Sequence, residues 1–394
     1  MKYLNKKTSP KGLAVWIIVL LVILAAVLFF PNLFTERMAD SYCRNTFPVI
    51  SFMGLAVSGL FMSSLTEAAV VVGGACMAVV IILIIVKFTG KVFGSNGGGA
   101  GIYAAVIFRR ILIIAVIMGI VFQLMHGIAY RRTPVVEQLD MDNDDYSIEA
   151  YEEALRWAYI NMLDARSRLG QDYNGVAHSA YTFESTVQHA NALLDSYSEE
   201  YDLGLSPNYV RAKGVSLSRY WSLTHIVGAY DPFLAEANIN TGYMDITSFA
   251  MTVTHELCHA KGYASETDCN IIAALACTRS TRADFKYAGF YYIFWDLYRV
   301  IYNNAKYNDG TIPSYLASEK IYPVYRDMAA RDAYWEMIDS MFMSEEIAEI
   351  SENTNDAFLK ANGGGGVASY KVPEDVYLDY YMTYIKPASE AEET

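Results

Sequence analysis

The chain alternates long apolar runs with polar segments in its first third, and this pattern predicts helices that cross a membrane. Leu13–Phe30, Ala68–Val86 and Ile111–Ile128 contain no Asp, Glu, Lys or Arg. Because about 20 apolar residues in a helix cross the hydrocarbon core of a bilayer, we predict three transmembrane helices and interpret residues 1–130 as a membrane anchor. Pro48–Ser64 is also apolar, but it is short and rich in Gly and Ser, which favours an interfacial or re-entrant segment.

After residue 130 the pattern changes to helical spacing interrupted by polar turns. Ser147–Leu169 places its apolar residues on one side of a helix. The residues after Pro232 fit a short strand that ends at Thr241, and the aromatic-rich stretch beyond Arg279 fits buried helices. We therefore predict that residues 131–394 form a second domain, mainly α with a small sheet.

Charge separates the same two parts of the chain. Residues 1–130 hold ten Lys and Arg against three Asp and Glu, whereas the remainder holds twenty against forty. The acidic second part argues against nucleic acid as a partner, and the lipid bilayer is the expected partner of the first part.

Basic residues also predict the orientation of the chain. Three spans would put the N-terminus and a loop from Lys87 to Arg110 on one side with eight basic residues, against four on the other. The positive-inside rule then favours a multi-pass protein of the cell membrane with a cytoplasmic N-terminus and an extracytoplasmic domain. If Pro48–Ser64 crossed the bilayer as well, the domain would lie in the cytoplasm.

One short motif carries most of the chemistry that the sequence offers. His255, Glu256 and His259 form the pattern H-E-x-x-H, and residues four apart lie on the same face of a helix. Two imidazoles on one face can bind one zinc ion, and the glutamate between them can act as general base towards a water molecule. Gly262 follows the motif, where a helix can end at a glycine in the left-handed conformation.

A catalytic zinc site needs a third protein ligand, and the next segment offers two candidates. Ser265 and Asp268 form a capping box that predicts a helix from Glu266 to about Arg279. We expect Glu266 to complete the site and Asn270 to orient a ligand histidine, while Asp268 either caps the helix or replaces Glu266 as ligand. Cysteine ligands are not expected, because none of the five cysteines forms a C-x-x-C pair.

Two further features bear on the substrate. A strand just before the H-E-x-x-H helix can pair with an extended peptide by β-addition, although an ordinary edge strand has the same pattern. The group that stabilises the oxyanion does not follow from spacing; His225, Tyr230 and Tyr263 are candidates by proximity alone. Intramembrane proteolysis is not favoured, because Asp245 and Lys261 interrupt any apolar run around the motif.

Taken together, these motifs resemble a bacterial membrane family known only as domain-of-unknown-function family 3810 and described as zincin-like. The resemblance rests on Tyr230–Phe233, Glu236–Asn240, His255–Asn270, Asn355–Lys360 and Ser369-Tyr370, and with the N-terminal spans it covers nearly the whole chain. Asp268 stands where members usually have Glu, which weakens a ligand role for that position, and Cys258 and Cys269 stand where they usually have Ala. The resemblance implies a zincin-like metal site and no particular substrate.

The sequence therefore predicts transmembrane helices at about residues 13–30, 68–86 and 111–128, followed by a zincin-like α+β domain with a small sheet. The expected function is zinc-dependent hydrolysis of a peptide or protein by a metal-activated water. His255, His259 and Glu266 are the expected Zn²⁺ ligands, and Glu256 is the expected catalytic base. A zinc-binding or degenerate zincin domain that acts as a cell-envelope binding module is the alternative; the intact Glu256 argues against it, because a structural site needs no base.

Overall fold

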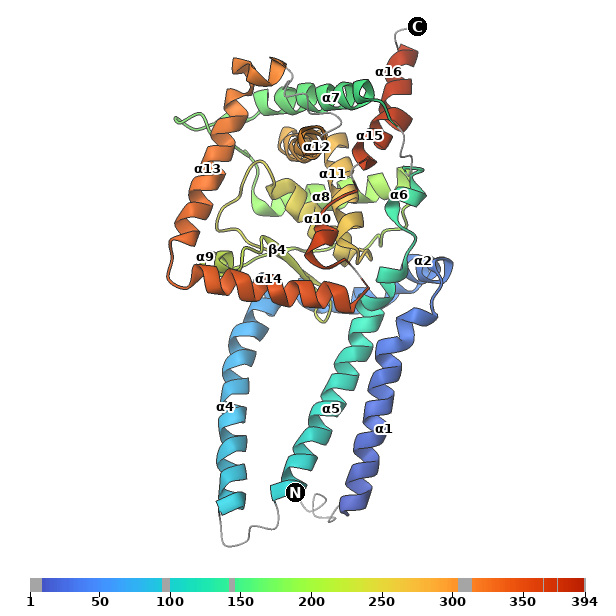
Figure 1. The fold of residues 1–394 in the computed structure, drawn as a ribbon, viewed down its shortest axis with the longest axis vertical. Helices are drawn as coiled ribbons and strands as arrows, with labels where there is room; N and C mark the ends of the chain where they lie inside the picture. The colour runs from blue at the N-terminus through green and yellow to red at the C-terminus, as the bar shows by residue number, and fades with distance from the viewer. Residues whose placement is uncertain are drawn as a thin grey trace.

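The structure is mainly helical, with three long apolar helices that extend from one end of a helical domain (Figure 1). The computed structural model describes residues 9–93, 100–141, 146–303, 314–363, 365–373 and 375–392. Among these residues, three helices are long and apolar enough to cross a membrane: α1 (Pro10–Phe29), α4 (Leu65–Phe93) and α5 (Ala100–Met125). The prediction of three such helices is confirmed by their length and composition.

The ends of these helices differ from the predicted boundaries. The loop predicted from Lys87 to Arg110 is wrong, because α4 continues to Phe93 and α5 begins at Ala100. Hydrogen bonds along a helix do not depend on apolar side chains, so a helix can continue beyond its apolar run, and long basic side chains can extend towards water. A 3-10 turn, η3 (Gly127–Arg131), leads from α5 into the domain.

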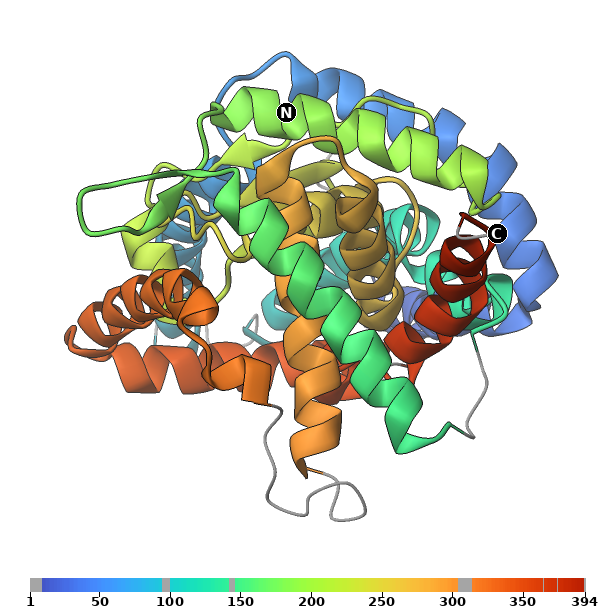
Figure 2. The ribbon, with the colours of Figure 1, turned by 90° about the horizontal axis from the view of Figure 1, so that it is seen from above.

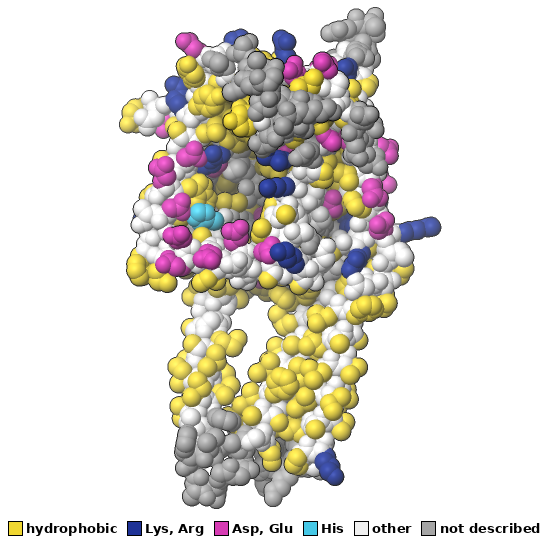
Figure 3. Space-filling view, viewed as in Figure 1, with side chains coloured by type: hydrophobic (Ala, Val, Ile, Leu, Met, Phe, Trp, Pro, Cys, Tyr) yellow, Lys and Arg dark blue, Asp and Glu magenta, His cyan; other side chains and the backbone are white. Residues whose placement is uncertain are grey.

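α1 packs along α5, whereas α4 approaches α5 only locally. Leu20 of α1 is buried together with Leu112 and Val116 of α5. No residue in the apolar window of α4 is buried, and Figure 3 shows open space between α4 and the other two helices. All three helices are hydrophobic around most of their visible surface (Figure 3), which is typical of helices surrounded by lipid.

Two short helices between α1 and α4 pack on the domain: α2 (Glu36–Asn45) and α3 (Phe47–Gly59). α3 has 13 residues, which is too few to cross a hydrocarbon core of about 30 Å. Its Leu55 is buried in the core of the domain, and a Cβ on Gly54 would lie 2.9 Å from the Cβ of Ala235. α3 therefore lies along the end of the domain from which the apolar helices emerge.

The remainder of the domain is built around three buried helices, α10 (Phe249–Ala260), α11 (Glu266–Arg279) and α12 (Ala283–Asn303). Figure 2 shows the other helices arranged around them. A Cβ on Gly289 of α12 would lie 2.8 Å from the carbonyl oxygen of Ala274, so the backbones of α11 and α12 are in close contact. The surrounding elements are α6 (Val135–Gln138), α7 (Ile148–Ser167), α8 (Phe183–Glu200), α9 (Ser218–Trp221), η4 (Ser222–Thr224), η5 (Ser314–Ala317), η6 (Glu319–Ile321), α13 (Tyr322–Asp339), α14 (Ser344–Ala361), η7 (Gly366–Tyr370), α15 (Val376–Tyr380), a π-helical turn (Tyr381–Ile385) and α16 (Lys386–Glu392).

Strands in the described part of the chain form two small sheets. β1 (Gly170–Gln171) pairs antiparallel with β2 (Ala177–His178). The second sheet has the order β3-β5-β4, with β3 parallel and β4 antiparallel to β5: β3 (Lys213–Gly214), β4 (Gly228–Asp231) and β5 (Glu236–Ile239). The small sheet is confirmed, and β5 is the strand expected after Pro232. β5 is the central strand, however, so the expected pairing of that strand with a peptide is wrong, and β4 was not predicted. The chain turns between residues 232 and 235, with Ala235 at φ +50°, so a strand lies on each side of that turn and β4 is an edge strand.

The N-terminal helices and the domain share one core. Leu55 of α3 and Met125 of α5 belong to the same buried cluster as α7, α10, α11 and α12. Glu236 of β5 is fully buried, and its carboxylate accepts hydrogen bonds from the backbone N–H groups of Leu65 at 3.2 Å and Thr66 at 2.8 Å. A negative charge at this position is favourable, because it lies at the positive N-terminal end of α4. The predicted division at residue 130 thus separates segments that pack on each other.

Candidate metal centre

The H-E-x-x-H residues lie on α10, as their spacing predicts. The helix ends at Ala260, and Gly262 in the turn after it has φ +106°, a conformation that glycine adopts without strain. Beside it, the side chain of Lys261 is completely buried, and its ammonium group donates to the carboxylate of Asp195 at 2.7 Å and to two backbone carbonyls. The turn after the motif is therefore held in one conformation by buried polar contacts.

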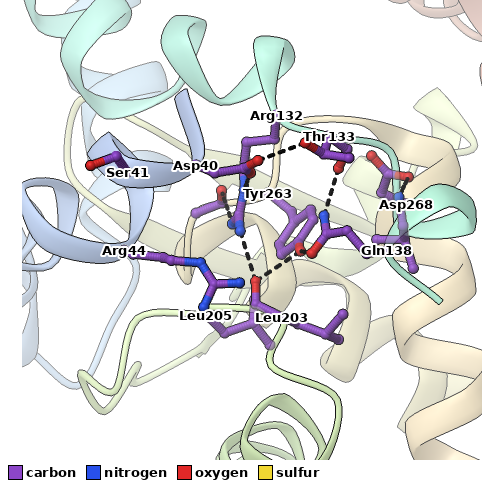
Figure 4. Close-up of polar contacts among 12 residues, drawn as sticks. Asp40, Ser41, Arg44, Arg132, Thr133, Gln138, Leu203, Leu205, Tyr263 and Asp268 are labelled. Carbon is purple, nitrogen blue, oxygen red and sulfur yellow. Dashed lines mark hydrogen bonds and ion pairs between the residues drawn. The ribbon is translucent and has the colours of Figure 1, made fainter. Parts of the chain in front are cut away.

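A second buried cation, Arg132, contacts the same turn (Figure 4). Its guanidinium donates to the carbonyls of Gly262 at 3.1 Å and Leu203 at 2.7 Å, and it pairs with Asp40 at 3.2 Å. The guanidinium carbon lies 3.8 Å from the ring centre of Tyr263, a favourable cation–π arrangement. Since Arg132 follows α5 and Asp40 lies on α2, the motif turn is fastened to the segments that adjoin the apolar helices.

Three side chains from α10 and α11 converge on one point, and we call them the ligand triad: His255, His259 and Glu266. His255 Nε2 lies 3.1 Å from both His259 Nε2 and Glu266 Oε2, and His259 Nε2 lies 3.3 Å from the same Glu266 oxygen. Tetrahedral zinc with bonds of about 2.0–2.1 Å separates its ligand atoms by roughly 3.3–3.4 Å. The observed distances fit that requirement, and two imidazoles with one carboxylate form a donor set that zinc accepts.

Two other predicted residues lie outside the ligand triad. Asp268 accepts a hydrogen bond from the backbone N–H at the start of α6 at 2.9 Å, and its own N–H is capped by Ser265, so it serves the start of α11. Asn270 donates to the backbone carbonyl of Tyr370 at 2.9 Å. The carbonyl of Tyr263 lies 2.9 Å from His259 Nδ1, and it therefore has the orienting role that we expected of Asn270.

Glu256 lies beside the ligand triad, and its Oε2 is buried without a hydrogen-bond partner in the described part of the chain. Burial raises the pKa of Glu256, and the imidazoles of His255 and His259 act in the opposite direction. A Cβ on Gly228 would lie 2.5 Å from Glu256 Oε1, so only glycine lets β4 pass directly against this carboxylate. The free oxygen is available to accept a proton from a molecule bound next to it.

A cavity of about 580 Å³ lies beside the ligand triad and Glu256. One wall is formed by β4, including Gly228 and Tyr230, and another by α14, including Ser351, Asn355 and Phe358. β4 is the edge of its sheet, so the outer side of its backbone is free to pair with an added strand. The cavity thus offers to one bound molecule a metal-ligand set, a strand edge and a carboxylate oxygen that has no partner among the described residues.

Two polar residues of this cavity to which sequence reasoning gave no role are His126 and Tyr370. The ring centre of His126 lies 5.8 Å from that of His259, and burial lowers the pKa of His126 to about 3, which keeps it neutral. The third predicted transmembrane helix extended to Ile128 and so included His126, whereas α5 ends at Met125. Tyr370 of η7 lines the cavity, and its place in the late element of the family resemblance was the one signal that pointed to it.

The three candidates for oxyanion stabilisation lie in different surroundings. Tyr230 lines the cavity, its hydroxyl is buried without a partner among the described residues, and its ring stacks at 6.4 Å on His259. His225 also lines the cavity, but its ring is half exposed and pairs with Asp339 at 2.8 Å. The hydroxyl of Tyr263 donates to a backbone carbonyl at 2.9 Å and lies outside the cavity wall. Tyr230 is the candidate whose position suits the role.

A family model described as protein of unknown function (DUF3810) matches residues 42–373 of the chain. The chain belongs to the DUF3810 family. The DUF3810 match begins in α2 and ends after η7, so it includes the ligand triad, Glu256 and every wall of the cavity. No curated protein and no solved structure matches the chain. Membership in this family therefore assigns no activity, and only the residues of the site indicate its chemistry.

Proposed function

We propose that this protein is a membrane-anchored zinc metallopeptidase that hydrolyses peptide bonds with Glu256 as the general base. The observation that supports this most strongly is the ligand triad next to a buried carboxylate oxygen that has no partner in the described part of the chain. A structural zinc site is usually closed by four protein ligands, whereas a catalytic site keeps one position open. Here the three ligands line a cavity, which favours the catalytic arrangement.

His255, His259 and Glu266 would hold the ion, and bound zinc would supply a Lewis acid that lowers the pKa of water to around 7. Glu256 accepts a proton from the attacking water as the water oxygen bonds to the scissile carbonyl carbon. It then donates that proton to the leaving nitrogen as the C–N bond breaks, which leaves a carboxylic acid, an amine and the original carboxylate. The raised pKa of Glu256 suits both transfers, because a proton carrier works best when its pKa is near the operating pH.

An extended polypeptide is the substrate that the cavity suits best. A peptide that pairs with the free edge of β4 would run past Glu256, since Gly228 brings that strand directly against the carboxylate. The hydroxyl of Tyr230 is buried without a described partner, and it would donate a hydrogen bond to the oxyanion.

Two substitutions in the purified full-length protein test this proposal. Glu256→Gln keeps the size of the side chain and removes the base, so zinc content and melting temperature should stay unchanged while cleavage of a mixed peptide library falls about a hundredfold or more. His259→Ala should lose both zinc and cleavage. A structural zinc site or a binding module would behave differently: Glu256→Gln would change nothing that is measured, and His259→Ala would lower the melting temperature.

We also propose that the domain lies outside the cytoplasm. α1, α4 and α5 give an odd number of candidate spans. Of the basic residues that flank these spans, more lie on the membrane side of the N-terminus than on the side of the domain. A topology reporter fused after Thr394 should be active outside the cytoplasm. Cytoplasmic activity of the same fusion would mean that the number of crossings is even or that the charge rule fails for this chain.

A further inference from the structure

The ligand triad lies close to the level at which α5 leaves its apolar segment. His126 is the first residue after the candidate span Gly101–Met125, and its ring centre is 5.8 Å from that of His259. One helical turn earlier, the ring of Phe122 contacts Phe358 of α14, with 5.9 Å between ring centres. The end of a candidate membrane-spanning helix therefore forms part of the wall around the site.

The end of the domain from which the apolar helices emerge is itself apolar. Met343, just before α14, and Ile350 and Phe358 of α14 are exposed. Figure 1 shows α14 at the end of the domain from which α4 and α5 emerge. The outward side of α3 is also exposed and apolar: Val49, Phe52, Met53, Val57 and Leu60. We call these two exposed faces the base of the domain.

Lipid is the occupant that the chain itself indicates for the base, because the base adjoins three helices that are apolar around their surface. Amphipathic helices that lie along a membrane bury their apolar face about 5–10 Å deep in the interface. α14 also lines the cavity through Ser351 and Asn355. The cavity therefore begins roughly one helix diameter, about 10 Å, from the lipid surface.

We infer that the site takes the juxtamembrane segment of polypeptides that are anchored in the same membrane, an inference that rests on the proposed peptidase function. An extended chain rises about 3.3 Å per residue, so a substrate that leaves its own span reaches the ligand triad within roughly three to ten residues. Anchorage in the same bilayer also raises the concentration of that segment at the site. A soluble polypeptide lacks both advantages.

A distance series tests the inference with the full-length protein in lipid nanodiscs. A single-span reporter protein carries one randomised peptide segment, either directly after its span or about 30 residues further out, which is roughly 100 Å of extended chain. We expect cleavage of the near segment to exceed that of the far segment at least tenfold. Equal cleavage at both positions, or preference for the free peptide, would overturn the inference and leave the peptidase function in place.

A change in the base provides a matched pair of variants. Ile350 is exposed and does not line the cavity, so Ile350→Glu should disturb contact with lipid without touching the site. Cleavage of the near segment should fall about tenfold because the substrate is no longer presented at the membrane surface, while cleavage of a free peptide stays the same. Glu349→Gln, on the neighbouring exposed position, should change neither rate. An equal loss for both substrates would contradict the proposed contact between lipid and the base of the domain.

A cross-linking measurement makes the test independent of hydrolysis. A photo-cross-linking amino acid at Ser351 in the Glu256→Gln protein should capture the reporter within about ten residues of its span, the reach set by the extended rise per residue. Capture spread evenly along the reporter would overturn the inference even if no peptide is ever cleaved. Absence of cleavage from every substrate, with capture still confined to the near segment, would count against the peptidase proposal alone.

Discussion

Replacement of Gly228 by alanine tests the geometry of the catalytic base most directly. The added Cβ would lie 2.5 Å from Oε1, 2.7 Å from Cγ and 2.8 Å from Cδ of Glu256. Non-bonded heavy atoms are comfortable at about 3.5 Å or more, so the carboxylate would have to move by roughly 1 Å. Gly228 does not have a positive φ, so its backbone accepts alanine, and the nearest contacts of the new Cβ are all with Glu256.

The size of the expected effect follows from that displacement. A shift of about 1 Å in a catalytic group can lower the rate a hundredfold, so we expect Gly228→Ala to lose between tenfold and a hundredfold of its hydrolysis. The destabilisation should fall at the low end of the roughly 1–3 kcal/mol typical of overpacking, because the group that moves is the end of a side chain that borders a cavity. Zinc content should not change, because no atom of the ligand triad is among the nearest contacts of that Cβ.

The assay combines initial rates on a peptide library with zinc content and melting temperature. Gly59→Ala is the matched control, since a Cβ on Gly59 of α3 would meet nothing within 4 Å. Wild-type rates from a zinc-loaded Gly228→Ala protein would refute the reasoning, because they would mean that the position of the Glu256 carboxylate does not matter. Loss of zinc together with activity would show that β4 supports the ligand triad itself.

Three further predictions concern stability, each measured by thermal unfolding of the full-length protein. Arg166→Ala should destabilise the folded protein by about 3–5 kcal/mol, because it leaves the fully buried Asp327 carboxylate without its ion pair. Loss of the exposed pair of Arg168 should change stability by less than about 1 kcal/mol, and equal losses of stability in the two variants would contradict this prediction. Gly289→Ala should destabilise by about 1–3 kcal/mol or more through the backbone contact with α11, and an unchanged melting temperature would mean that the two helices separate easily. Burial lowers the pKa of His189, so this imidazole binds a proton more readily in the unfolded state, and stability is lost as the pH falls below about 6.5. His189→Gln should therefore make the drop in melting temperature between about pH 7.5 and 5.5 smaller. An unaltered drop would mean that His189 does not contribute to this pH dependence.

The ligand triad could be predicted from sequence because it depends on short-range geometry. His255 and His259 share a face of one helix, the left-handed Gly262 lies in the turn after that helix, and Glu266 begins the next one. His126 and Tyr370 could not be predicted in the same way, because only long-range packing brings α5 and η7 to the same cavity. The spacing of apolar residues within either segment does not indicate that contact.

The long helices of the fold could be predicted from the sequence, but their ends and the pairing of the strands could not. The apolar runs identified the long helices, since a single side-chain pattern repeats over many turns. The limits of α4 and α5 did not follow, because helical hydrogen bonding continues past the last apolar residue. β4 and β5 are four residues each, too short to show a clear alternation, and the pairing of β5 with β3 depends on residues outside that segment.

The buried carboxylate of Glu236 has a consequence for how the protein is made. β5 lies between β3 and β4, and Glu236 finds its hydrogen-bond donors at the start of α4, which leaves the ribosome about 170 residues earlier. A chain whose α4 is not yet in place would leave this carboxylate buried without those donors, a penalty of several kcal/mol. The strand edge beside Glu256 is then stable only after the N-terminal helices have been inserted. The wall of the cavity that β4 forms thus depends on a segment that is synthesised long before it.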